Sequence, residues 1–128
     1  TANLGFSTAA AENLYLPVDP NPGNATVEAQ EADETSMLNH IRRVLALRKA
    51  NPDLGNYSPM EVFYAENGDK LFAVKRGEMI VAVNPGLTVK ELALDGAYQM
   101  VYTFGEAGAS GKLLTLGAQS MAVLKPVK

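Results

Sequence analysis

Cysteine and tryptophan are absent from the 128 residues of this chain, and histidine occurs only once. The absence of cysteine excludes disulfide bonds, thiolate metal sites and thiol nucleophiles. No apolar run reaches the roughly 20 residues that a membrane span needs, and residues 1–11 lack the pattern of a signal peptide. The net charge of −3 leaves no basic footprint for nucleic acid. We therefore expect neither a membrane nor a nucleic acid as partner.

Lysine and arginine are missing from the first 41 residues, whereas four of them follow within positions 42–49. Acidic residues precede this cluster, and a helix with acids at its start and bases at its end complements the helix dipole. Apolar residues recur here at spacings of three and four, as on one face of a helix. The pattern predicts a helix over residues 33–52, with Asp33 as its N-cap and Pro52 as its stop. The apolar residues of this face are Met37, Leu38, Ile41, Val44, Leu45 and Leu47.

Residues 1–32 combine turn-forming proline, glycine and asparagine with apolar residues that follow no helical or strand period. The sequence predicts an irregular loop. A long loop that carries this much apolar surface is unusual in a domain that stands alone. We therefore expect the loop to pack on another part of a larger protein. Its apolar residues are Leu4, Phe6, Leu14, Tyr15, Leu16 and Val18.

Residues 57–128 show short apolar runs separated by turns, which predicts about seven antiparallel strands in a small sandwich. Asn67-Gly68 predicts a two-residue type I′ hairpin that pairs Phe63 with Phe72 and Tyr64 with Leu71. Both faces of this hairpin are apolar, so we expect both to be covered. Residues 105–111 contain mostly glycine, alanine and serine, and they predict a loop.

Candidate catalytic groups are few. His40 lies inside the predicted helix and has no second histidine or cysteine with which to share a metal. None of Ser7, Ser36, Ser58, Ser110 and Ser120 lies in a G-x-S-x-G elbow. The glycines of residues 105–111 precede a strand rather than a helix, so they form no phosphate-binding loop. The acidic residues of the β-region show no paired arrangement. We expect no catalytic residue, no metal and no cofactor in this chain.

Three stretches of the loop resemble glycoside hydrolase family 13, the α-amylase family. They are Asn3-Leu4-Gly5-Phe6-Ser7-Thr8, Tyr15-Leu16-Pro17-Val18 and Thr26-Val27-Glu28-Ala29-Gln30. They are similar to the late active-site-side loop of the α-glucosidase and oligo-1,6-glucosidase branch. Residues 36–52 resemble the last helix of the (β/α)8 barrel in these enzymes, and Asn56-Tyr57-Ser58 resembles the start of their C-terminal antiparallel β-domain.

The resemblance implies a mostly β chain that consists of the last barrel loop (residues 1–32), the last barrel helix (33–52) and a C-terminal antiparallel β-sandwich (57–128). It implies a parent enzyme that cleaves α-glucosidic bonds with retention, and whose catalytic acids lie upstream of this chain. The partners would be the catalytic barrel and, through it, an α-glucan or oligosaccharide. Asn3 and Phe6 would lie at the rim of the sugar site, although loop packing alone is an alternative role for them.

Two other interpretations stay open at this stage. One is a free-standing carbohydrate-binding module, although aromatic residues make up only 7% of the chain. The other is an interaction domain without sugar contact. The uncovered apolar face of the predicted helix also leads us to expect self-association of the chain. Nothing in the sequence indicates a cellular compartment.

Overall fold

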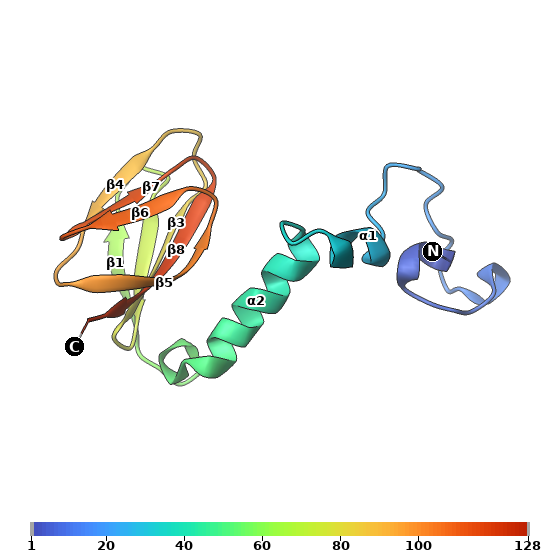
Figure 1. The fold of residues 1–128 in the computed structure, drawn as a ribbon, viewed down its shortest axis with the longest axis horizontal. Helices are drawn as coiled ribbons and strands as arrows, with labels where there is room; N and C mark the ends of the chain where they lie inside the picture. The colour runs from blue at the N-terminus through green and yellow to red at the C-terminus, as the bar shows by residue number, and fades with distance from the viewer. Residues whose placement is uncertain (1, 128) are drawn as a thin grey trace. The chain divides into compact units, whose positions relative to one another are not determined.

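The computed structural model describes residues 2–127, and these residues form two compact units, 2–46 and 47–127. The first unit holds two short 3-10 helices, η1 (Ala2–Gly5) and η2 (Ala11–Asn13), the helix α1 (Val27–Ala32) and most of α2 (Met37–Ala50). The second unit begins with the last turn of α2 and η3 (Pro52–Leu54), and then consists of strands (Figure 1). The strands are β1 (Met60–Ala65), β2 (Phe72–Arg76), β3 (Met79–Asn84), β4 (Lys90–Ala93), β5 (Tyr98–Phe104), β6 (Ala107–Ser110), β7 (Leu113–Leu116) and β8 (Ser120–Pro126).

The predicted long helix begins later than expected. Asp33 does not cap α2, because its Oδ1 accepts bonds from the backbone N–H and the hydroxyl of Thr35 at 2.8 and 2.7 Å. Ser36 is the cap instead, since its Oγ accepts a bond from the N–H of Asn39 at 3.2 Å. Part of the predicted irregular loop is also helical. Thr26 caps α1 by accepting the N–H of Ala29 at 3.0 Å.

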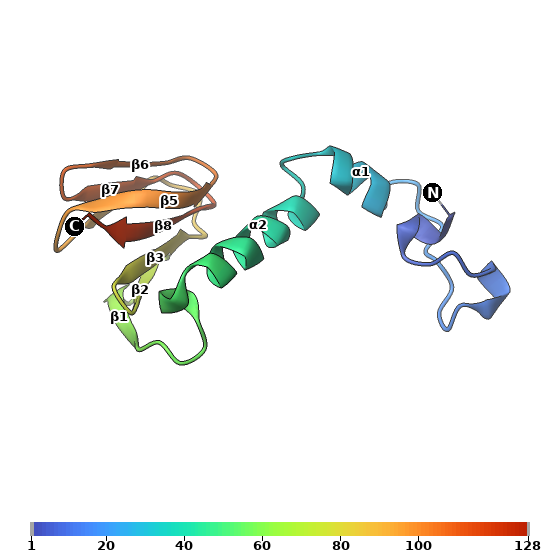
Figure 2. The same ribbon diagram turned by 60° about the horizontal axis from the view of Figure 1, so that its bottom comes forward.

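The second unit is built from two antiparallel sheets that lie one above the other, as Figure 2 shows. The larger sheet has the strand order β1-β2-β3-β8-β5, and the smaller has the order β4-β7-β6. The mostly β architecture with antiparallel sheets that the sequence predicts is thus confirmed. Among residues 2–127, none of the helices combines the length and hydropathy that a membrane span requires.

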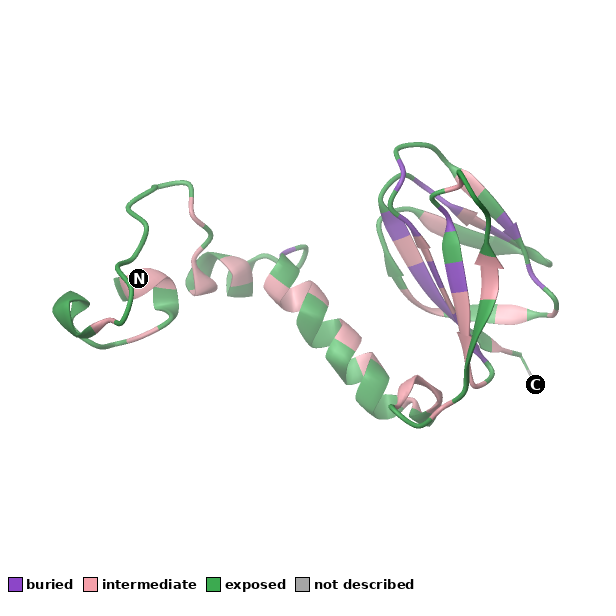
Figure 3. Ribbon diagram, turned by 180° about the vertical axis from the view of Figure 1, so that it is seen from behind, coloured by how far each residue is buried: buried purple, intermediate pink, exposed green. Residues whose placement is uncertain are grey.

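The core lies between the two sheets. A row of small residues, Ala73, Ala82 and Ala122, crosses the middle of the larger sheet and is fully buried. Leucines of the smaller sheet complete the core from the opposite side. Figure 3 shows that buried residues gather in the strands, whereas α2 has no buried residue. The leucines of the smaller sheet and of the adjoining turn are Leu92, Leu94, Leu114 and Leu116.

A strand replaces the predicted loop at residues 105–111. Ala107–Ser110 form β6, which pairs with β7 through registers such as Ala107 with Leu116 and Ala109 with Leu114. These small residues carry no hydrophobic alternation, so their own sequence gives no strand signal. They form a strand because β7 offers backbone hydrogen bonds along the edge of the smaller sheet.

The Asn67-Gly68 turn is present, but the predicted two-residue hairpin is wrong. Ala65 pairs with Phe72, so the connection spans residues 66–71. Gly68 has a φ of +85°, whereas Asn67 is not among the described residues with positive φ. A type I′ turn needs positive φ at both central residues, so this turn is of another type.

The predicted pairing in this hairpin is wrong as well. A bulge between Val62 and Tyr64 shifts the register, so that Tyr64 pairs with Ala73 instead of Leu71. The expectation that both faces are covered also fails. Phe72 and Val62 remain 44% and 63% exposed, while Ala73 on the other face is completely buried.

Candidate functional site

The loop that holds Asn3 and Phe6 begins with an unusual backbone turn. Asn3 and Leu4 have φ values of 50° and 58°, and Gly5 follows with 84°. Non-glycine residues rarely adopt this left-handed conformation, and surrounding contacts must hold them there. Asn3 supplies such contacts, because its Nδ2 donates to the carbonyls of Ser7 at 2.9 Å and Ala9 at 2.8 Å.

A hollow of about 300 Å³ lies within this loop. Both residues predicted for the sugar rim, Asn3 and Phe6, line it. The amide N–H group of Asn3 is engaged with the loop's own backbone, whereas the Phe6 side chain is 79% exposed. The hollow is therefore shaped by Asn3 and offers an accessible aromatic ring at Phe6. Its remaining lining is Leu4, Ser7, Leu14, Leu16, Pro17, Val18 and Asp19.

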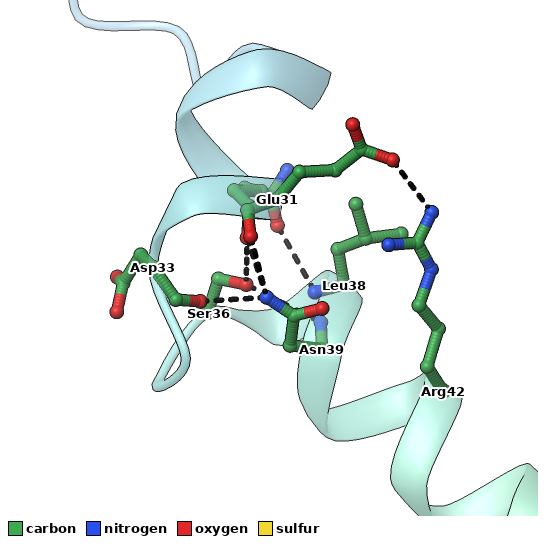
Figure 4. A network of polar contacts seen from close by, with 7 residues as sticks. Glu31, Asp33, Ser36, Leu38, Asn39 and Arg42 are labelled. Carbon is green, nitrogen blue, oxygen red and sulfur yellow. Dashed lines mark hydrogen bonds and ion pairs between the residues drawn. The ribbon is translucent and has the colours of Figure 1, made fainter.

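A dense polar network fixes the corner between α1 and α2 (Figure 4). The carbonyl of Gln30 accepts the hydroxyl of Ser36 at 2.6 Å and Nδ2 of Asn39 at 2.8 Å. The same Nδ2 lies 2.9 Å from the carbonyl of Asp33, and Oε1 of Gln30 accepts the N–H of Leu38 at 3.1 Å. These bonds satisfy backbone groups at the end of α1 and the start of α2. No local sequence pattern indicates this network, because its partners lie up to nine residues apart.

Three of the five serines are bonded to backbone carbonyls of the chain. The hydroxyls of Ser36, Ser58 and Ser120 donate to the backbone carbonyls of Gln30, Pro52 and Gly117, respectively. A hydroxyl that is held by its own backbone is a structural group. His40 lies within α2, as predicted. Among residues 2–127, no group of three or more histidine, aspartate and glutamate side chains is placed to hold a metal ion.

Two aspartates of the β-unit are bonded to lysines and tyrosines rather than to another carboxylate. Asp69 lies 2.8 Å from Lys90 Nζ and accepts the hydroxyl of Tyr64 at 2.8 Å. The bond from Lys90 holds the pKa of Asp69 well below its usual range, and the N–H of Leu71 and the Tyr64 hydroxyl lower it further. The bond to Asp69 raises the pKa of Tyr64 to about 12. Asp69 is therefore held as an anion in an ion pair at neutral pH.

Asp95 repeats this arrangement at another place. Its carboxylate is paired with Lys75 and accepts the hydroxyl of Tyr98 at 2.8 Å. The bond from Lys75 lowers the pKa of Asp95 and raises the pKa of Lys75. The ammonium of Lys75 also lies 5.3 Å from the ring centre of Phe63, which is a cation–π distance. Both clusters therefore consist of ion pairs and hydrogen bonds that connect parts of the β-unit.

Sequence comparison finds a trehalose synthase/amylase and a probable α-glucosidase among the relatives of this chain. The chain is 35% identical to the trehalose synthase/amylase TreS of Mycobacterium tuberculosis over 89 residues, which cover 56% of this chain and 15% of the relative. It is 46% identical over 50 residues to a probable α-glucosidase of Rhizobium meliloti, covering 39% of this chain and 8% of that protein. The chain thus spans only a small part of the relatives that it matches. No model of a protein family matches it.

Solved structures share the fold. A mutant of MutB, from crystals soaked with trehalulose, superposes on this chain with a TM-score of 0.76 at 23% identity. The match covers 98% of this chain and 24% of the MutB chain. The α-amylase from H. orenii gives a TM-score of 0.69 at 22% identity over 88% of this chain and 25% of its own. In each neighbour the matching region is about a quarter of a longer chain. The relatives and the shared fold confirm the resemblance: in sequence and fold this chain is similar to a C-terminal region of glycoside hydrolase family 13, the α-amylase family.

Proposed function

We propose that this chain is the C-terminal part of an enzyme that acts on α-glucosidic bonds of oligo- or polysaccharides. The observation that carries the proposal is the alignment of two differently named relatives, a trehalose synthase/amylase and an α-glucosidase, with the same chain. Residues 1–32 would complete the last loop of the catalytic barrel, and residues 33–52 its last helix. Residues 57–128 would form a β-domain that stabilises the barrel.

In this proposal the chain contributes no catalytic group. The parent enzyme would use carboxylates of earlier barrel strands and form a covalent glycosyl-enzyme intermediate. The bonding of Asp69 and Asp95 supports this division of roles, because each is neutralised by a lysine. A retaining site needs two carboxyl groups about 5 Å apart that face one sugar bond. Neither aspartate has a carboxylate among its bonded partners.

Phe6 and Asn3 would shape the rim of the sugar site. The exposed ring of Phe6 would contact a sugar, and Asn3 would hold the turn that presents this ring. Packing of Phe6 on the barrel is the competing role. Phe6→Ala and Phe6→Leu in the full-length enzyme distinguish the two, because leucine keeps apolar volume and loses the ring. Rim contact predicts a higher KM for both variants at an unchanged melting temperature. Packing predicts that only the alanine variant has a higher KM, and that its melting temperature is also lower.

The experiment that tests the proposed function starts from the upstream coding sequence and the full-length protein. We expect upstream segments with the acidic strand motifs of a (β/α)8 barrel, and turnover of a chromogenic α-glucoside by the full-length protein. An upstream sequence without such motifs would overturn the proposal. The free-standing carbohydrate-binding module is not favoured by the comparisons. It would predict that the 128-residue chain alone binds malto-oligosaccharides in calorimetry.

A further inference from the structure

The connection between β1 and β2 carries the one asparagine of the chain that glycine follows, Asn67. Asn67 and Gly68 form the tip of this connection, and both are exposed. The N–H of Asp69 closes the turn by donating to the carbonyl of Glu66 at 3.1 Å. The third residue of a turn closed in this way does not use its own N–H for the closing bond. The backbone nitrogen of Gly68 therefore follows the Asn67 side chain at a position that water reaches.

The space around Gly68 is open as well. Its φ is +85°, and even a Cβ at this residue would meet no atom within 4 Å. The backbone nitrogen that follows an asparagine can attack the side-chain amide carbon, because the ring that forms has five members. A side chain on the attacking residue hinders this approach, and glycine has none. The tip of the turn thus combines a nucleophile, an amide carbon and room for both to meet.

The other asparagines lack one or more of these features. Three of them precede proline, whose nitrogen has no hydrogen to lose, namely Asn21, Asn51 and Asn84. Side-chain hydrogen bonds hold four more, which are Asn3, Asn24, Asn39 and Asn56. The N–H that follows Asn13 donates to the carbonyl of Ala11 at 3.3 Å. Within residues 2–127, no hydrogen bond holds the side chain of Asn67.

We infer that Asn67 is a site of spontaneous deamidation, with water as the co-reactant. The nitrogen of Gly68 attacks Cγ of Asn67, so that a new C–N bond forms and the Cγ–Nδ2 bond breaks. The hydrogen of the Gly68 N–H leaves with the amide nitrogen as ammonia, and a five-membered succinimide remains. Water then opens the ring at either of its two carbonyl carbons, which yields aspartate or isoaspartate. One water is consumed and one ammonia is released, and no atom is oxidised or reduced.

The isoaspartate product would disturb Asp69, two residues further along the chain. In this product the main chain runs through Cγ of residue 67 and is one carbon atom longer. Asp69 is bonded on three sides, because Lys90 lies 2.8 Å from its carboxylate, Leu71 donates its N–H at 3.1 Å, and the Asp69 N–H closes the turn. A longer main chain before Asp69 cannot keep all three contacts in place. The aspartate product keeps the length of the main chain and adds only a charge.

The test follows every asparagine of the folded 128-residue chain during incubation in mildly alkaline buffer made with oxygen-18 water. Peptide mass spectrometry detects each conversion as a mass change that includes one oxygen-18 atom, and circular dichroism shows that the chain stays folded. A synthetic peptide of residues 63–72 gives the rate without the fold. Asp95-Gly96 is an internal contrast, because the Asp95 carboxylate is paired with Lys75 and should not isomerise in the same period.

We expect Asn67 to convert before any other asparagine. Its rate should be no more than about 30-fold below that of the peptide, because an exposed turn opens at little cost in free energy. Conversion of another asparagine first would overturn the inference. A rate at Asn67 below this bound would also overturn it, since the fold would then protect the site.

The Asn67→Asp variant separates the added charge from the longer main chain. Its urea midpoint should stay close to that of the unmodified chain, because an exposed surface charge has little effect on stability. The isoaspartate form, isolated by chromatography, should have a lower midpoint, with an unfolding equilibrium shifted by about 5- to 30-fold. Equal midpoints for the isoaspartate form and the Asn67→Asp variant would refute the proposed effect on Asp69.

Discussion

Nζ of Lys90 on β4 lies 2.8 Å from Oδ1 of Asp69 in the connection between β1 and β2, so this ion pair joins the smaller sheet to the larger one. A second pair of reversed polarity follows the other end of β4, where Asp95 pairs with Lys75 of β2. β4 is therefore tied to the larger sheet on both sides. At the start of β4 the smaller sheet supplies the base, Lys90, and beyond its end it supplies the acid, Asp95. A reversed or shifted β4 would therefore lose both ion pairs.

Acid should weaken the link through Asp69. Its pKa is lower in the folded chain than the value of about 4 in an unfolded chain, so the ion pair adds stability above that pH and loses it as pH falls. We expect Asp69→Asn to lower the urea midpoint at pH 7 and to lower it less at pH 3. Glu91→Gln on the outward side of β4 is the control and should leave both midpoints unchanged. An equal fall of the urea midpoint at pH 3 and at pH 7 would contradict the stabilising role of this ion pair.

Gly77 and Gly68 should respond differently to alanine. Both have positive φ, +55° and +85°, so the backbone strain of an L residue is common to the two sites. A Cβ at Gly68 meets no atom within 4 Å, whereas one at Gly77 would lie 2.7 Å from Cγ of Asp53. We expect Gly68→Ala to lower the free energy of unfolding by about 1–2 kcal/mol, from left-handed backbone strain alone. Gly77→Ala should cost at least about 1 kcal/mol more because of the steric overlap. Equal urea midpoints for the two variants would refute this account of the Gly77 site.

The corner between α1 and α2 should depend on Asn39. Its Nδ2 lies within 3.2 Å of the carbonyls of Gln30, Glu31 and Asp33, so Asn39→Ala leaves the end of α1 without these bonds. A loss of about 1–2 kcal/mol should speed amide hydrogen exchange in α1 about 5- to 30-fold. The exposed pair of Arg42 with Glu31 is the contrast. Arg42→Met should change exchange far less, since exposed ion pairs contribute about 0–1 kcal/mol. Similar acceleration by both variants would argue against the network.

Self-association of the 128-residue chain is a further prediction. Met37, Ile41 and Leu45 lie four residues apart on α2 and are 63%, 46% and 50% exposed. An apolar stripe of this kind favours association between copies. Sedimentation velocity at several concentrations should show oligomers, and Ile41→Asp should shift the chain to monomer. Ala46→Asp, on another side of the same helix, should leave the distribution unchanged. A monomer at all concentrations would mean that the stripe does not associate.

Parts of this fold follow from local sequence alone. Spacing predicts α2, because apolar residues from Met37 to Leu47 repeat with a helical period and Pro52 ends the pattern. Its start is predicted wrongly, since Asp33 and Ser36 are both residues that commonly cap helices. Only the bonds of Ser36 to Gln30 and Asn39 decide between them. The existence of β3 and β8 is likewise predicted from their apolar runs.

The missed features depend on partners that are distant in sequence. β6 consists of small residues and is a strand only because it pairs with β7. The exposure of Val62 follows from the bulge before Tyr64, which changes the face that each neighbouring side chain occupies. The hollow at Phe6 was not predicted from the sequence, because its lining residues show no regular spacing.

The most direct test of the central claim is an assay of the full-length protein beside the 128-residue chain on a chromogenic α-glucoside. The catalytic carboxylates are expected upstream, so the full-length protein should turn over the substrate and the 128-residue chain should give only the buffer rate. Addition of the 128-residue chain should not raise the activity of the full-length protein. Turnover by the isolated chain, or none by the full-length protein, would contradict the assignment of this chain as the non-catalytic C-terminal part of an α-amylase-family enzyme.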